Sequence, residues 1–354
     1  LGVGSYPTNT IVLKWMDSSE DEEGFSVERA EGFVEARWRE VASLPAGATV
    51  YTDTAVLSAT TYWYRVRAFN ASGNSAYSNE SFNSTIGATP SLDEQYMMVL
   101  INEARAAPEA FGYPGYPPAP PLAFNATLGY SARAHSQSIL NAQAQFGHCD
   151  LANRCPLERA KDAGYPDGTD CGENLIQGDT GPAFMESANQ GFMNSEGHRG
   201  NMLSPGFNEV GVGHQVTAHT SPSMFWQGQV TEVFCSRAGV EPPVIPVGAV
   251  IPYTAPSAAA STVFTYAVNF YSTEGAPTVA LVYIDGTSHE LGLSTGQADN
   301  GTYRFVTELA GGADHTYYFY FEYGANRTAR WPESGEIDLP LVERSLYMPA
   351  VAKP

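Results

Sequence analysis

Apolar and polar positions alternate in short runs along the first ninety residues, and turn-forming residues separate the runs. These runs are residues 10–15, 24–30, 37–42 and 61–69. Such a pattern predicts β-strands. In the last run, Tyr62, Tyr64 and Val66 alternate with Trp63 and Arg65, so the first three side chains are expected in a core. Trp15 is a further core candidate, and residues 80–90 look like a linker.

Helical spacing begins after this segment. Ser91 and Glu94 form a capping box, Tyr96, Val99, Leu100 and Glu103 follow at helical spacing, and Pro108 ends the helix. A second helix is predicted after its N-cap Asn125, and a third over residues 155–164. A fourth begins at Pro182. Strand-like residues 208–216 and 224–234 come next, so helices followed by a hairpin predict an α+β or α-β-α sandwich.

From about residue 244 the alternation of strands returns. Strand-like runs cover residues 261–272, 276–286, 301–309, 315–324 and 337–342. Tyr317, Phe319 and Phe321 are expected on one face of their strand, which leaves aromatic side chains on the other face as well. We therefore expect that second face to be an interface, or to lie under a neighbouring part of the same chain.

The pattern thus predicts a multidomain protein. An N-terminal β-sandwich spans 1–88, a central α-β-α sandwich (α+β) spans 89–240, and a C-terminal β-sandwich with a tail spans 241–354. The first and last residues are parts that a sandwich does not require. Donation of a terminal strand to a neighbouring subunit would build a homopolymer, and packing of the tails on their own chain is the simpler alternative.

Composition narrows the partners. The formal net charge is −20, which argues against nucleic acids and anionic membranes and favours divalent cations. No apolar run is long enough to span a bilayer. The chain opens without a signal-peptide pattern, which fits a cytosolic protein or a mature secreted one, and cysteine usage favours the second.

All four cysteines, Cys149, Cys155, Cys171 and Cys235, fall between the two strand-rich ends of the chain. No pair has the spacing of a zinc knuckle, so two disulfides formed in an oxidising compartment are predicted, with three pairings open. Six acceptor sequons for N-glycosylation support secretion, and crowding of these residue types in turns is the alternative explanation. The six begin at Asn70, Asn79, Asn83, Asn125, Asn300 and Asn326.

Longer motifs carry family resemblances. Residues 51–79 resemble a fibronectin type III module, and residues 279–324 resemble an immunoglobulin-like sandwich of bacterial and archaeal surface proteins. Between them five ordered motifs look like the CAP superfamily, which includes cysteine-rich secretory proteins, venom antigen 5 and plant pathogenesis-related proteins. Those motifs are "VLINEARAAP", "PLAFNATLGYSARAHS", "FGHCD", "CGENLIQG" and "FMNSEGHRGNMLSPGFNEVGVG".

The CAP resemblance implies an α-β-α sandwich and a cleft with two histidines and two acids. Matched motif by motif, these are His148, Glu173 and His198, with Glu196 as the second acid. The last match departs from the family pattern, because Ser195 stands where the acid is expected and Phe192 replaces a tryptophan three residues earlier.

Three interpretations of this cluster remain open. It is a hydrogen-bond network that holds loops together, a site for a divalent cation (zinc, magnesium or calcium), or a catalytic centre. Ser195 and His198 are a weak Ser/His pair, since no third group is assigned. His135 falls on an apolar helix stripe and is expected to be a core histidine, with a site-lining role as the alternative.

Two functions follow. The favoured one is a non-enzymatic, secreted or cell-surface structural or adhesive glycoprotein, including a subunit of an extracellular fibre. Its CAP-like domain would bind a cation, lipid, glycan or protein partner. The alternative is an extracellular metal-dependent or histidine-dependent hydrolase with sandwiches as targeting modules. The incomplete catalytic set favours the first.

Overall fold

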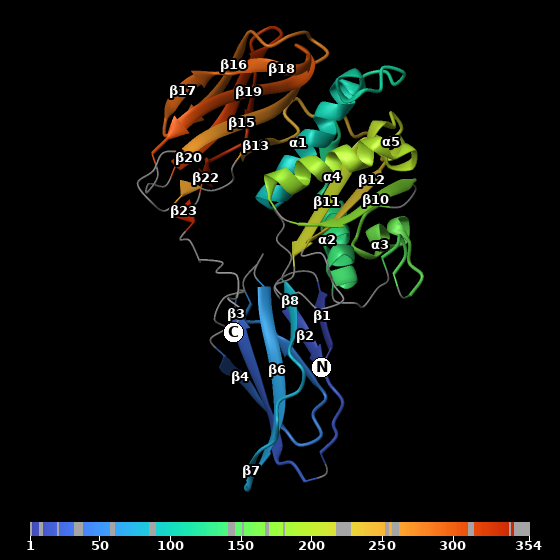
Figure 1. The fold of residues 1–354 in the computed structure, drawn as a ribbon, viewed down its shortest axis with the longest axis vertical. Coiled ribbons are helices and arrows are strands. Elements are labelled where there is room, and N and C mark those ends of the chain that lie inside the picture. Colours follow the sequence, from blue (N-terminus) through green and yellow to red (C-terminus); the bar gives the residue numbers. More distant parts are fainter. Residues whose placement is uncertain are drawn as a thin grey trace, which may run out of the picture. The chain divides into compact units, whose positions relative to one another are not determined.

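The computed structural model divides the chain into two compact units, residues 1–89 and 90–354 (Figure 1). The second unit spans both predicted segments 89–240 and 241–354. The structure describes residues 2–6, 10–19, 21–31, 38–56, 61–84, 90–140, 146–150, 152–166, 170–179, 181–216, 228–251, 255–256, 262–310, 315–339 and 341–342. The predicted multidomain fold with sandwiches of strands and an α-β-α sandwich is confirmed, whereas most of the C-terminal tail lies outside the described residues.

The first unit consists of strands only in its described part. They are β1 (Gly2–Tyr6), β2 (Thr10–Lys14), β3 (Gly24–Glu31), β4 (Arg39–Pro45), β5 (Val50–Asp53), β6 (Thr61–Asn70), β7 (Gly73–Asn74) and β8 (Ser81–Ser84). One sheet has the order β1-β2-β5 and the other β4-β3-β6-β7, with β8 also paired to β6. Residues 81–84, predicted as linker, therefore belong to a sheet because their backbone completes its edge.

The core of the first unit lies between these two sheets. Trp15 is in that core, as are the predicted Tyr62, Tyr64 and Val66. A buried ion pair also links the sheets, with Arg29 Nη1 of β3 2.6 Å from Asp53 Oδ2 of β5. Alternation along β6 therefore places its odd-numbered side chains away from this core, as expected.

The CAP-like part of the second unit has five helices among its described residues. Its elements are α1 (Leu92–Ala106), η1 (Pro108–Phe111), β9 (Ala123–Phe124), α2 (Ala126–Leu140), α3 (Pro156–Asp162), β10 (Cys171–Gly178), α4 (Pro182–Asn194), α5 (Glu196–Leu203), β11 (Glu209–Val216) and β12 (Gly228–Cys235). The sheet has the order β10-β12-β11-β9. Helices α2 and α3 lie on one face, and α1, α4 and α5 lie on the other (Figure 1).

Capping hydrogen bonds fix the first residues of α1 and α2, and glycines allow α2 to pack closely on the sheet. Ser91 and Glu94 form the predicted capping box of α1, and Asn125 Oδ1 accepts hydrogen bonds from two backbone N–H groups of α2. Helix α2 packs directly on two glycines of β11, since a Cβ on Gly211 or Gly213 would lie 2.1 or 2.2 Å from its backbone. Larger residues there would push the helix off the sheet.

The C-terminal part of the second unit is a second set of strands. They are β13 (Gly248–Ile251), β14 (Ala255–Pro256), β15 (Thr262–Tyr271), β16 (Val279–Ile284), β17 (Thr287–Glu290), β18 (Gly292–Gln297), β19 (Asn300–Leu309), β20 (His315–Tyr323), β21 (Arg327–Trp331), β22 (Ile337–Leu339) and β23 (Leu341–Val342). Two sheets, β13-β15-β19-β18 and β17-β16-β20-β21, enclose a core. Tyr317, Phe319 and Phe321 point into that core, as predicted.

Helix α1 is buried on all sides, with twelve of its fifteen residues buried. The sheet β13-β15-β19-β18 covers the side of α1 that the CAP-like sheet and α4 leave open. Ala249 and Ala267 of that sheet join the same core cluster as the helix. Asn269 Nδ2 donates to Val99 O (3.2 Å), and Arg304 Nη2 lies 2.7 Å from Glu103 Oε2.

This packing predicts that a charge at Ala267 disrupts the whole second unit. Ala267 is fully buried against α1, whereas Thr265 lies two residues away on the same strand face and is half-buried. Ala267→Glu should lower the free energy of unfolding by about 3 kcal/mol, measured by urea denaturation with near-UV circular dichroism. Thr265→Glu should change it by about 0.5 kcal/mol or less. Equal effects of the two substitutions would show that α1 is not covered by the strand at Ala267.

Candidate functional site

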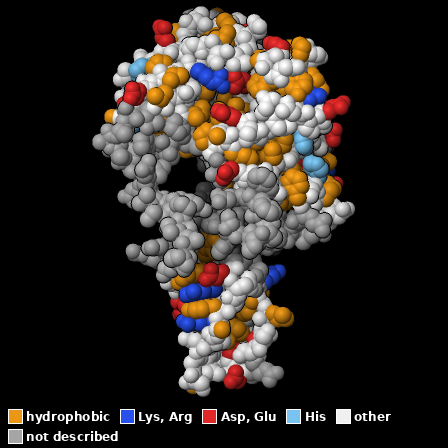
Figure 2. Space-filling view, viewed as in Figure 1, with side chains coloured by type: hydrophobic (Ala, Val, Ile, Leu, Met, Phe, Trp, Pro, Cys, Tyr) orange, Lys and Arg blue, Asp and Glu red, His pale blue; other side chains and the backbone are white. Residues whose placement is uncertain are grey.

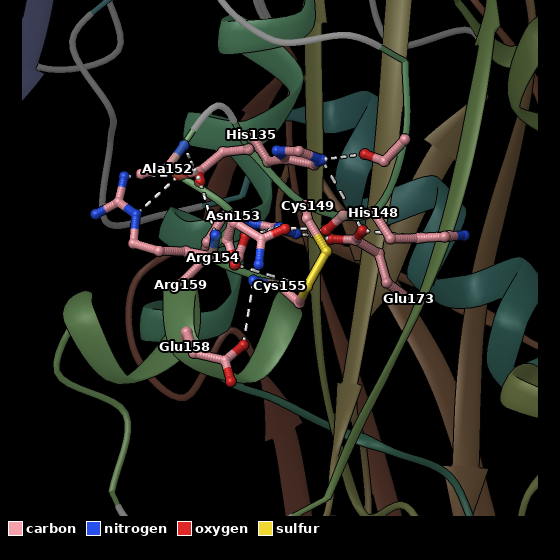
Figure 3. Close-up of a disulfide and its surroundings, with 12 residues drawn as sticks. His135, His148, Cys149, Ala152, Asn153, Arg154, Cys155, Glu158, Arg159 and Glu173 are labelled. Carbon is pink, nitrogen blue, oxygen red and sulfur yellow. Dashed lines mark hydrogen bonds and ion pairs between the residues drawn. A yellow bond between two sulfur atoms is a disulfide. The ribbon is translucent and has the colours of Figure 1, made fainter.

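Glu173 of β10 is the centre of a cluster that unites three separate segments of the chain (Figure 3). Its side chain is 1% exposed. Oε1 lies 3.1 Å from His148 Nδ1, and Oε2 accepts a hydrogen bond from the guanidinium of Arg159 on α3. Both carboxylate oxygens therefore have partners, and the negative charge is balanced by a buried cation.

A disulfide holds the two partners of Glu173 together. Cys149 follows His148 directly, and its bond to Cys155 closes the loop that leads into α3. Cys155 is the N-cap residue of that helix, and Arg159 lies one turn further along. Arg159 Nη1 also donates to the backbone carbonyls of His148 and Arg154. The loop and helix thus form one tied unit that presents an imidazole and a guanidinium to the same carboxylate.

The second disulfide joins Cys171 and Cys235, which face each other on β10 and β12. The prediction of two disulfides is therefore confirmed, and the structure selects one of the three pairings that the sequence left open. This bond fixes the start of β10 two residues before Glu173. Both disulfides therefore border the cluster.

The pKa values of the two predicted site histidines shift in opposite directions. His148 has a 54% exposed side chain, and its hydrogen bond to Glu173 raises its pKa. Burial and then the charge of His148 lower the pKa of His198. His198 lies on α5, whose backbone is tied to β10 because Asn174 Nδ2 donates to His198 O (3.2 Å).

His135 of α2 is a further member of this cluster. It is 1% exposed, as expected for a core histidine, and burial is the main cause of its lowered pKa. As the neutral imidazole, its Nε2–H donates to Gly147 O (2.8 Å), and the same nitrogen lies 3.9 Å from Glu173 Oε1. The buried histidine therefore also supports the loop that carries His148.

The remaining predicted residues do not join the cluster in the same way. Glu196 is exposed in the first turn of α5, and residues two positions apart on a helix do not share a face, so it is directed away from His198. Ser195 is the N-cap residue of α5 without a capping hydrogen bond from its side chain. Among the described residues, no hydrogen bond joins Ser195 to His198, and no third group completes a catalytic set.

Comparison with known proteins gives this arrangement a family. Residues 99–229 match the family model described as the cysteine-rich secretory protein family, CAP. The chain contains a CAP domain. The uncharacterized protein YkwD of Bacillus subtilis (strain 168) is 38% identical over 94 residues, which are 27% of this chain and 35% of YkwD. The match thus spans about a third of the length of that relative.

Solved structures give weaker likenesses. An extracellular protein with an SCP domain from Bacillus anthracis str. Ames is 17% identical, with a TM-score of 0.31 over 66% of each chain. An outer surface protein from Borrelia burgdorferi is 15% identical, with a TM-score of 0.30 over 40% of this chain and 92% of its own. The identities of the two flanking sandwiches stay predictions.

The donor set of the CAP domain fits a metal ion poorly. The described residues contain no group of three or more His, Cys, Asp or Glu side chains arranged to hold one. The buried carboxylate of Glu173 is already paired with the Arg159 guanidinium, which balances its charge. Cation binding by His148, Glu173, His198 and Glu196 therefore stays a prediction that the geometry does not favour.

Four of the six predicted glycosylation sites, Asn70, Asn79, Asn125 and Asn300, donate hydrogen bonds from their side-chain Nδ2. Asn125 Nδ2 donates to Glu209 Oε1 (2.8 Å), and Asn300 Nδ2 donates to Ala119 O (3.1 Å). A glycan there would replace those bonds. Asn326 lies in an exposed turn between β20 and β21. The side chain of Asn83 lies outside the described residues, and glycosylation at any of the six stays a prediction.

Sequence reasoning missed the buried acid Glu232 on the opposite face of the CAP sheet. Its Oε2 accepts a hydrogen bond from Asn174 Nδ2 (2.9 Å), and its Oε1 has no hydrogen-bond partner in the described part of the chain. Burial raises the pKa of Glu232 to about 8. The signal was an acid among Val230, Val233 and Phe234 in β12, where every residue is buried.

Glu232 predicts a fall in stability with rising pH. Its pKa is about 8 in the folded chain against the usual 4.5, so between these values only the unfolded chain releases the proton. The stability is fully present below about pH 4.5 and is lost as the pH rises through about 8. In urea denaturation, Glu232→Gln should remove this loss, by up to about 4 kcal/mol near pH 9.

Glu290→Gln is the matched control for this measurement, because Glu290 is exposed on β17. Its substitution should leave the dependence on pH as it is in the wild type. Parallel curves for wild type and Glu232→Gln would show that Glu232 is ionised in the folded chain.

Proposed function

We propose that this chain is an extracellular, non-enzymatic binding protein, and that the surface around His148 is where the CAP domain contacts its partner. The observation that carries this proposal is the charge-balanced, buried state of Glu173. A carboxylate with one oxygen on Arg159 and the other on His148 is not available as a general base.

The described residues also give little support to hydrolysis. Ser195 forms no hydrogen bond to His198 among the described residues, so this pair does not assemble a nucleophile with its base. Arg159 and His148 bind the two carboxylate oxygens of the buried Glu173. A network of satisfied hydrogen bonds stabilises loops and rigidifies a surface instead.

Binding is favoured by what this network presents to solvent. Phe146 is 56% exposed and His148 has a 54% exposed side chain, with one residue between them. The visible face in Figure 2 shows exposed histidine side chains beside hydrophobic ones. Aromatic side chains on rigid loops are typical anchors of interfaces, because little entropy is lost when they bind. An aromatic ring beside an imidazole suits a polypeptide partner.

The extracellular location rests on the two disulfides, which form and persist in oxidising compartments. None of the described helices combines the length and apolar character of a membrane span. The β-sandwiches act as structural modules in this proposal. Assembly into a fibre through the chain ends is a separate proposal, and a monomer at high concentration in sedimentation analysis would contradict it.

Selection of peptides tests the binding proposal. A phage-displayed library of random peptides, selected on the full chain, should yield ligands whose affinity falls about tenfold or more with Phe146→Ala or His148→Ala. His289→Ala is the matched control, because His289 stacks on Phe305 in the C-terminal sandwich (4.7 Å between ring centroids). Ligands insensitive to both site substitutions would contradict the proposed surface.

Enzymatic turnover is tested separately. The full chain should hydrolyse casein and a chromogenic ester no faster than the doubly substituted chain His148→Ala/His198→Ala. A turnover that the double substitution removes while circular dichroism shows an intact fold would overturn the non-enzymatic proposal in favour of the hydrolase.

A further inference from the structure

The guanidinium of Arg159 balances the charge of the buried Glu173 in the CAP domain. The carboxylate is 1% exposed and meets Arg159 at Oε2 and His148 at Oε1. A buried carboxylate requires a partner of opposite charge, and Arg159 already supplies it. A metal ion on Glu173 would place a second cation beside a buried guanidinium.

Arg159 is held in this place by more than the ion pair. Its side chain is 8% exposed, and Nη1 donates to the carbonyls of His148 and Arg154. The Cys149–Cys155 disulfide closes the loop that provides these carbonyls. The guanidinium therefore cannot leave Glu173 without breaking its other hydrogen bonds, and it is not readily displaced by an ion from solution.

The donor atoms for a metal ion are nevertheless close to the same carboxylate. His148 Nδ1 lies 3.1 Å from Glu173 Oε1, and His135 Nε2 lies 3.9 Å from it. Two imidazoles and one carboxylate form a donor set that zinc uses in proteins. His135 would exchange its hydrogen bond to Gly147 for the ion. These side chains are of the types that bind zinc, although as they lie beside Arg159 they are not arranged to hold an ion.

We propose that Arg159 takes the place of a metal ion on Glu173. The wild-type chain then binds no Zn²⁺ at this carboxylate, and removal of the guanidinium creates a zinc site of Glu173 with His135 and His148. This inference does not depend on the partner proposed for the surface around His148.

Zinc titration of the intact chain without a histidine tag tests the proposal. Calorimetry and elemental analysis after dialysis against Zn²⁺ compare the wild type, Arg159→Met and Arg154→Met. Arg154 is the matched control, because it lies in the same loop but forms ion pairs with a 50% exposed side chain. Each chain is also measured with Glu173→Gln, so that zinc bound elsewhere on this acidic protein cancels in the difference.

The expected result is Glu173-dependent zinc binding in Arg159→Met alone, with an affinity at least about tenfold above that of the wild type. Arg154→Met should match the wild type. Where Glu173→Gln prevents folding, His148→Ala serves as the reference.

Two results would overturn the proposal. One is Glu173-dependent zinc binding by the wild type. The other is a folded Arg159→Met chain that binds no more zinc than the wild type. An Arg159→Met chain that folds only with Zn²⁺ would support the proposal, because the ion then supplies the missing charge. One that folds neither with nor without Zn²⁺ would contradict it.

Discussion

Helix α1 is buried around its whole circumference, so the second unit has to supply a cover for each of its faces. The CAP sheet and α4 cover part of it, and the sheet β13-β15-β19-β18 covers the rest. Polar contacts then fix the orientation, since Asn269 reaches the backbone carbonyl of Val99 and Arg304 pairs with Glu103. The C-terminal strands are therefore part of the CAP core rather than a module carried beside it.

The cluster around Glu173 is built on both faces of one strand, β10. Strand β10 is the edge strand of its sheet. Its side chains alternate between the two faces, toward α3 on one face and toward α5 on the other. Glu173 meets Arg159 of α3, while the next residue, Asn174, binds the backbone of His198 on α5 and the buried Glu232. Asn201 of α5 donates to the backbone carbonyl of Glu173 itself. Two helices that do not touch the same face are thus coupled through two consecutive residues.

Much of the architecture could be predicted from sequence because it depends on local chemistry. The capping box at Ser91, the cap at Asn125 and the alternation of Tyr317, Phe319 and Phe321 are read within a few residues, and the structure contains all three. The family motifs also predicted that His148 and Glu173 meet. The burial of α1 on every side could not be predicted, because its second cover comes from strands more than a hundred residues later. The role of Arg159 was missed for a related reason, since an arginine on a short, exposed-looking helix carries no local sign of its partner on another strand.

The same long-range dependence explains why these donor residues alone do not define a metal site. Histidines and acids identify candidate ligands, but the charge that the surrounding structure already supplies decides whether an ion is needed. Here the loop closed by the Cys149–Cys155 disulfide delivers both an imidazole and a guanidinium to one carboxylate. The guanidinium is buried, and its other hydrogen bonds go to the backbone of that loop. The same contacts therefore neutralise Glu173 and hold the loop that exposes Phe146 and His148. A site of this kind is rigid, and the charge of its carboxylate is neutralised before a partner binds. This suits recognition better than chemistry on the carboxylate.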